Sequence, residues 1–219
     1  MISKVKRNGR SVSQFVYNEI KKSIINFEFK PGMNFEENKL SQRFKVSRTP
    51  IRTALSKLER EGLVSGAFYK GFTVQQLSIQ EFYEICVVRE MLEGYATEIA
   101  ATKLKNEDLI ELERIQKNFE DLQENLLNPD LLAIHNELDA QLHGLILRCC
   151  GNGTIQRIIQ NLSDKIQQIR FTASLERVKE SIFEHLRIIE KLKAQDPNVA
   201  KKAMVDHLLA LKEKFHKQW

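Results

Sequence analysis

One stretch decides the fold of the first third of the chain: Val46-Ser47-Arg48-Thr49-Pro50-Ile51-Arg52-Thr53-Ala54-Leu55. Pro50 suits the first turn of a helix, and Ser47 or Thr49 can cap that helix. Apolar residues then recur at helical spacing along one face, at Ile51, Ala54, Leu55 and Leu58. Arg48 and Arg52 are four residues apart and share the opposite face. The stretch therefore predicts a helix with one buried side and a cationic, exposed beginning.

The residues on either side of this helix complete a small domain. We expect a first helix over residues 12–27, a break at Lys30-Pro31-Gly32 and a second helix over residues 37–44. After the central helix, which ends near Gly62, two strand-like runs at residues 63–68 and 72–75 flank a turn. Three helices followed by a β-hairpin predict a winged helix-turn-helix over residues 1–76.

The exposed end of the central helix has the chemistry needed to read DNA. A helix in the major groove uses small polar groups and arginines, which grip guanine or phosphate with two hydrogen bonds. The turn of the hairpin adds a lysine suited to phosphate and a glycine that allows close approach. The expected contacts are Ser47, Arg48, Thr49, Arg52, Lys70 and Gly71.

The charge of the chain is divided unevenly between its two parts. Residues 1–78 carry 15 Lys and Arg against 6 Asp and Glu, a net charge of +9. The remaining residues carry 19 against 23, a net charge of −4, and together these give the +5 of the whole chain. A basic first part favours contact with a polyanion. No stretch approaches the roughly 20 apolar residues of a membrane span, and we expect a cytoplasmic protein that keeps Cys86, Cys149 and Cys150 as buried free thiols.

From residue 79 onward the sequence predicts only helices. Ser78 and Glu81 form a capping box for the first of them. The six expected helices cover residues 78–104, 106–127, 128–150, 154–172, 175–194 and 196 to near the C-terminus. Short connections imply antiparallel neighbours. The expected fold is therefore mainly α, with an all-α antiparallel six-helix bundle over residues 79–219.

All five histidines fall in this second part. Asp139 and His143 lie four residues apart on one helix, and His185 and His207 lie inside the next-to-last and last helices. Three imidazoles and a carboxylate can converge in a bundle and hold Zn²⁺, Ni²⁺ or a related ion. Spacing alone leaves open whether these are ligands or ordinary core and surface residues.

The N-terminal motifs closely resemble the GntR family of bacterial regulators. They include Phe29-Lys30-Pro31-Gly32, Val46 to Leu55, and Glu61-Gly62-Leu63-Val64. The resemblance covers about residues 12–76 and implies that Ser47, Arg48, Thr49, Arg52, Lys70 and Gly71 contact DNA. Some relatives read bases with an arginine at the start of the second helix. Asn38 or Lys39 stands there in this chain, and Lys39 can take a phosphate.

The C-terminal part resembles the FCD type of effector domain, in its shorter, VanR-like form. The motifs are Asp139-x-x-Leu142-His143, Cys150-Gly151-Asn152, Glu184-His185 and Ala203-Met204-x-x-His207-Leu208. The resemblance implies that a divalent metal, Zn²⁺ or Ni²⁺, is held by Asp139, His143, His185 and His207. It gives no role to His135 or His216, which we interpret as ordinary residues.

The resemblance also implies an effector and a partner. Arg89 and Glu93 match a family Arg-x-x-x-Glu pattern; Arg89 either meets the carboxylate of a small organic acid or pairs internally with Glu93. Relatives dimerise through this domain, so the operator should be an inverted repeat of double-stranded DNA. The leading hypothesis is a transcriptional repressor controlled by an organic acid. The alternatives are a regulator that senses the metal directly and a metal-dependent enzyme, for which we find no general base or nucleophile motif.

Overall fold

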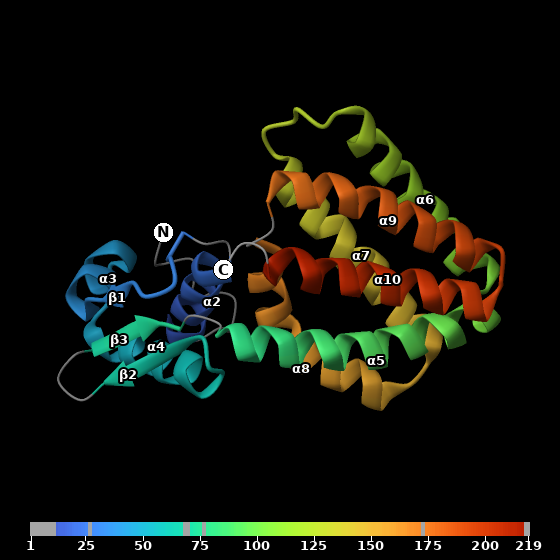
Figure 1. Ribbon diagram of the computed structural model, residues 1–219. Coiled ribbons are helices and arrows are strands. Elements are labelled where there is room, and N and C mark those ends of the chain that lie inside the picture. The colour runs from blue at the N-terminus through green and yellow to red at the C-terminus, as the bar shows by residue number, and fades with distance from the viewer. Residues whose placement is uncertain (1–11, 26–27, 68–70, 76–77, 172–173, 217–219) are drawn as a thin grey trace. The chain divides into compact units, whose positions relative to one another are not determined.

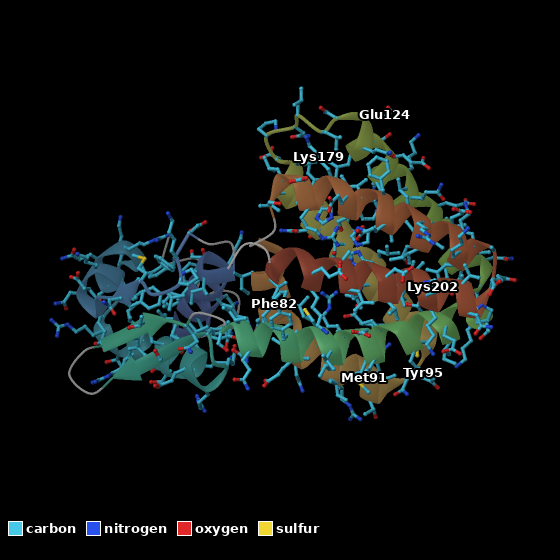
Figure 2. The ribbon with its side chains drawn as sticks, viewed as in Figure 1. Phe82, Met91, Tyr95, Glu124, Lys179 and Lys202 are labelled. Atoms are coloured by element: carbon cyan, nitrogen blue, oxygen red, sulfur yellow. The ribbon has the colours of Figure 1, made fainter. Side chains whose placement is uncertain are left out.

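The computed structural model describes residues 12–25, 28–67, 71–75, 78–171 and 174–216. The chain divides into two compact units, Met1–Leu77 and Ser78–Trp219. Figure 1 shows helices and a small sheet in the first unit and helices in the second, and Figure 2 shows the side chains of both units as sticks in the same view. Across the described residues, no helix has the length and apolar character needed to cross a membrane.

The first unit combines helices with a small antiparallel sheet. Its elements in chain order are α2 (Val12–Ile25), β1 (Asn34–Phe35), α3 (Glu37–Phe44), α4 (Arg48–Arg60), β2 (Val64–Ala67) and β3 (Gly71–Val74). The strand order is β1-β3-β2. In register, Phe35 pairs with Phe72 and Ser65 pairs with Thr73. The winged-helix prediction is confirmed, with β1 as a third strand that the sequence did not predict.

The core of this unit lies under α4. The apolar face expected from the sequence is buried, with Ile51, Leu55 and Leu58 fully covered. They pack in one cluster with residues from α2, among them Ile20. Burying each of these side chains contributes about 1.5–3 kcal/mol relative to leaving it in water. This packing holds the opposite face of α4 toward solvent.

The second unit is all-helical in the residues that the structure describes. Its elements are α5 (Ile79–Lys103), α6 (Asn106–Glu124), α7 (Leu131–Cys150), α8 (Gly153–Phe171), α9 (Leu175–Lys193) and α10 (Pro197–His216). α5 and α10 pack in opposite directions, since Lys201 pairs with Glu98 while Val205 contacts the backbone at Gly94. In Figure 1, α10 lies between α5 and α9.

Two predicted boundaries are wrong in this unit. The second helix was expected to reach residue 127, whereas α6 ends at Glu124. The sequence placed the start of the third helix of the bundle at Asn128-Pro129, whereas α7 begins at Leu131. The side chain of Asn128 accepts a hydrogen bond from the backbone N–H of Asp130, which forms a turn ahead of the helix. At the other end, Gly151 adopts φ +71° and terminates α7 as expected.

Candidate metal centre and nucleic-acid interface

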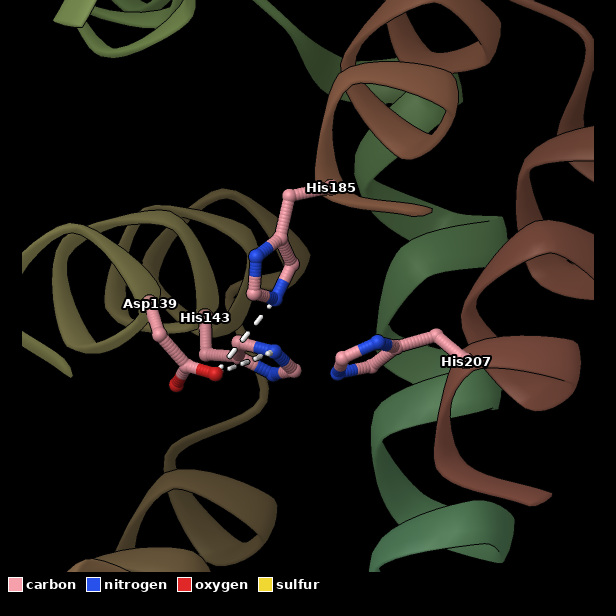
Figure 3. Close-up of side chains that lie close together, drawn as sticks. All are labelled: Asp139, His143, His185 and His207. Atoms are coloured by element: carbon pink, nitrogen blue, oxygen red, sulfur yellow. Dashed lines mark ion pairs between the residues drawn. The ribbon is translucent and has the colours of Figure 1, made fainter. Parts of the chain in front are cut away.

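Four buried polar side chains meet in the centre of the second unit. Asp139 and His143 project from α7, His185 from α9 and His207 from α10 (Figure 3). One ligand atom from each residue lies within 4.8 Å of the others. All four residues are at least 96 % buried. The structure thus brings together the complete set that the sequence singled out.

The histidines engage the surrounding protein through their Nδ1 atoms. Nδ1 of His143 contacts a carboxylate oxygen of Glu93, and Nδ1 of His207 lies 2.7 Å from Oε2 of Glu184. Nδ1 of His185 lies 3.5 Å from the hydroxyl of Ser181. A neutral ring that donates from Nδ1 keeps its lone pair on Nε2. This is the arrangement in which outer partners orient histidine ligands around a metal.

Two arginines complete these contacts. Arg89 Nε donates to Glu93 at 2.6 Å, and both side chains are almost fully buried. Arg177 binds Glu184 through two nitrogens at 3.1 and 2.7 Å. Each carboxylate therefore has a guanidinium on one side and a histidine on the other. Because buried charges are costly unless paired, these networks fix the rings in place.

The electrostatics favour neutral rings at His185 and His207 and an ionised carboxylate at Glu93. Burial lowers the pKa of His185 and of His207 well below the ordinary value, and it outweighs Asp139, which acts in the opposite direction on both rings. Burial alone would raise the pKa of Glu93, but Arg89 and His143 outweigh it and hold that pKa far below its usual range. Both histidines are thus in the protonation state that a metal ligand requires.

The donor set fits a divalent transition-metal ion. Nε2 of His143 and Nε2 of His185 are buried and make no hydrogen bond to any described residue. His185 Nε2 also lies 3.4 Å from Oδ1 of Asp139. Several nitrogen donors with one carboxylate oxygen suit Zn²⁺, Ni²⁺ and related ions. An ion at this point would satisfy buried nitrogens that otherwise cost free energy.

The other candidate residues that the sequence indicated in this unit lie as follows. Arg89 is outside the four-residue set and forms the internal pair with Glu93 that was one of its two interpretations. His135 is buried, and its ring centre lies 5.4 Å from that of His185. The side chain of His216 lies outside the described residues. Glu184 and Arg177 were missed as supporting residues, because only the packing of α9 against α10 brings them to His207.

The exposed face of α4 carries the expected DNA-contacting residues. Ser47, Arg48, Thr49 and Arg52 are all exposed. Ser47 occupies the N-cap position without a side-chain capping bond, so its hydroxyl is not used in that way. Gly71 begins β3 with φ +77°, a conformation that favours glycine. Lys70 lies outside the described residues.

Acidic side chains of α3 contact two of the candidate cations. Nε of Arg52 lies 3.6 Å from Glu37, and Nζ of Lys39 lies 2.7 Å from Glu36. Arg52 is 74 % exposed, which leaves its guanidinium accessible. Glu37 joins α3 to α4 and limits the directions in which Arg52 can extend.

Comparisons with known proteins agree with this picture. The description "Bacterial regulatory proteins, gntR family" matches residues 12–74, and the FCD domain matches residues 84–210. The uncharacterised HTH-type transcriptional regulator YdhC of Bacillus subtilis is 31% identical over 202 residues, covering 87% of this chain and 85% of that protein. The HTH-type transcriptional repressor RspR of Escherichia coli is 26% identical, covering 92% and 88%. The solved structure of E. coli McbR/YncC superposes with a TM-score of 0.75 at 22% identity, over 95% of this chain and 99% of that one.

The fold, the cationic helix and these matches define the class: a DNA-binding transcriptional regulator, not an enzyme. The winged helix supplies the DNA-binding part of such a protein. The chain belongs to the GntR family of bacterial regulators, and its second unit is an FCD domain.

Proposed function

We propose that this regulator is a metal-containing repressor that responds to a small organic acid. The observation that carries the proposal is the set Asp139, His143, His185 and His207, whose ligand atoms lie within 4.8 Å in the interior of the second unit. The Nε2 atoms of His143 and His185 make no hydrogen bond and lie 4.0 and 3.4 Å from Oδ1 of Asp139, which supports a metal rather than a purely structural cluster. Zn²⁺ and Ni²⁺ suit the donors best.

The bound ion supplies a positive charge and coordination positions that a carboxylate can fill. Side chains of the protein orient the metal ligands and bind the acid. Glu93 and Glu184 hold the rings of His143 and His207 in orientation. Arg89 has its Nε committed to Glu93, so its terminal nitrogens are what remain for an organic acid. We therefore keep Arg89 as the proposed effector-binding residue, acting through those terminal nitrogens.

Burial of the site gives the effector a route to control DNA binding. The four side chains are almost completely covered, so an acid reaches them only when the helices around the site separate. A ligand that binds one arrangement of the helices better than another shifts the population toward that arrangement. The spacing or orientation of the two winged-helix domains of the dimer then changes relative to an inverted-repeat operator.

On the DNA side, the proposed contacts are Lys39, Ser47, Arg48, Thr49, Arg52, Lys70 and Gly71. Arg48 and Arg52 read bases or grip phosphates from the exposed face of α4, and Lys39 takes a phosphate. Six described helices in the second unit agree with the shorter, VanR-like form of the domain. Repression is proposed by analogy with RspR, whose name states that activity.

A second candidate is direct metal sensing. The observation that favours it is the close packing of the cluster, in which the ring centroids of His185 and His207 are 4.5 Å apart. If the ion alone is the signal, adding metal changes operator affinity without any organic acid. If the metal is resident, that affinity responds to an acid only in the loaded protein.

The experiment that tests the metal site is reconstitution followed by elemental analysis. We expect one divalent ion per chain in the native protein and a large loss in His185→Ala. The matched control is His135→Ala, which removes an equally buried imidazole outside the four-residue set and should keep its metal. Native protein without metal, or equal loss in both variants, overturns the proposed site.

A further inference from the structure

Asn136 carries a buried hydrogen-bond donor that the fold does not use. The side chain is 95 % buried, and its amide nitrogen Nδ2 has no partner among the described residues. The amide oxygen lies 3.3 Å from Nδ1 of His135. Because an amide oxygen only accepts, that ring nitrogen donates to it, and Nδ2 is left as the free end. A buried donor without a hydrogen bond costs free energy, so its position favours a ligand oxygen as its partner.

The position of Asn136 places this donor on the metal-site side of α7. Asn136 precedes His143 by seven residues, nearly two helical turns, so the two share a face of α7. Asp139 lies between them on the same side. α5 runs alongside this face in the same direction, because Glu93 contacts His143 and Lys103 contacts the carbonyl of Cys150. The donor therefore borders the proposed effector site.

We propose that Asn136 determines which acid the site accepts, by donating a hydrogen bond to a neutral oxygen at the end of the effector remote from the metal. The inference rests on the proposed metal–carboxylate site. Asn136 lies one turn before Asp139, a rise of about 4.5 Å along the helix. An acid whose carboxylate meets the ion thus reaches Asn136 with its far end.

The chemistry of the amide defines the class of that far end. A second carboxylate would bring another buried charge, which requires a cation of its own. The Nε of Arg89 is paired with Glu93, and its terminal nitrogens are proposed to bind the carboxylate at the ion, so this guanidinium is not available to a second carboxylate. A neutral hydroxyl or carbonyl oxygen satisfies Nδ2 without adding charge. The effector class is therefore a short-chain acid with a terminal hydroxyl or oxo group.

The test uses metal-loaded, full-length protein and calorimetric titration. The probes are propionate, butyrate and valerate, each compared with its ω-hydroxy counterpart. We expect at least one hydroxy acid to bind the native protein roughly 2- to 10-fold more tightly than its parent. Asn136→Leu, of similar volume, should bind both members of the pair alike and keep its metal content. The matched control is Asn161→Leu, an exposed amide on α8, which should keep the preference.

Each other outcome contradicts the inference in a distinct way. Equal affinity of native protein for both members of every pair overturns the role of Asn136 while leaving the metal–carboxylate site intact. If no acid binds the loaded protein, the proposed effector class itself is wrong. If Asn136→Leu does not fold, the test is a structure of native protein with the bound hydroxy acid. The inference predicts that the hydroxyl lies within hydrogen-bond distance of Nδ2. A water in that place instead contradicts the inference.

Discussion

At the scale of single residues, burial sets the charge of the histidine cluster. His185 and His207 lie in the interior, and burial is the main reason that the pKa of each falls well below the ordinary histidine value of 6.5. The rings are thus neutral at neutral pH, with lone pairs available. The same depression makes the stability of the metal-free protein depend on pH.

We expect the free energy of unfolding of the metal-free protein to fall as the pH drops below about 6.5. The unfolded chain takes up protons on these histidines first, whereas the folded chain resists until its own lower pKa is reached. The stability is fully present above 6.5, the unfolded pKa. Urea denaturation with a chelator at several pH values measures the slope. His185→Phe should reduce it, and an unchanged slope in that variant contradicts the assignment.

Glu184 is expected to set metal affinity although it is not in the four-residue set. Its carboxylate lies 2.7 Å from Nδ1 of His207 and accepts a hydrogen bond from Arg177. Removal of such an outer partner costs about 10- to 100-fold in affinity. Competition titration with a metal indicator should show this loss in Glu184→Gln. Glu176→Gln, an exposed change on the same helix, should leave affinity unchanged, and equal effects of both changes argue against the role.

At the scale of secondary-structure elements, α3 and α4 form the surface proposed to read DNA. α4 buries Ile51, Leu55 and Leu58, and this packing fixes which residues remain outside. Glu37 of α3 lies 3.6 Å from Arg52 of α4. This exposed ion pair gives Arg52 an acidic neighbour and leaves its guanidinium accessible to DNA.

Arg52→Ala should weaken operator binding by about 1–3 kcal/mol and relax preference at one base pair, if Arg52 grips a guanine. Binding to a set of single-base operator variants, at fixed salt, measures both effects. Arg60→Ala is the matched control, because Arg60 is exposed at the other end of the same helix. Unchanged selectivity in Arg52→Ala shows that Arg52 contacts only the backbone or nothing.

Helices were predictable from the sequence where local chemistry determines them. α5 starts at Ile79 because the Ser78 hydroxyl accepts the backbone N–H of Glu81, a contact between near neighbours in sequence. β1 was not predictable: its two residues form a strand only by pairing with Thr73 and Phe72, far along the chain. The start of α7 was misplaced because Asn128-Pro129 serves a turn as well as it serves a helix cap.

The same limit applies to the candidate site. Asp139 and His143 could be paired from their spacing on one helix. Their convergence with His185 and His207 followed from family resemblance, since the distances between helices are not encoded in spacing. The support by Glu184 and the free donor of Asn136 depend on interhelical packing and on burial. Glu184 stands in the Glu184-His185 motif, but that motif does not indicate its contact with His207, and no local pattern indicates the role of Asn136.

At the scale of the whole molecule, a DNA-binding winged helix precedes an FCD domain that is proposed to hold a metal ion. The two units are separate compact bodies, and the chain between them is short in sequence. In the proposed mechanism, a signal at the metal reaches DNA only if the acid distinguishes two arrangements of the proposed dimer. The strength of regulation is then the coupling free energy between acid and operator.

The most direct test of this coupling is operator affinity measured with and without the acid, in metal-loaded and metal-stripped protein. An effective acid should weaken binding of the loaded protein to an inverted-repeat operator by roughly 5- to 150-fold, a coupling of about 1–3 kcal/mol. In stripped protein the same acid should have no effect. An equal response after the metal is removed, or a loaded protein whose operator affinity no acid changes, contradicts the account.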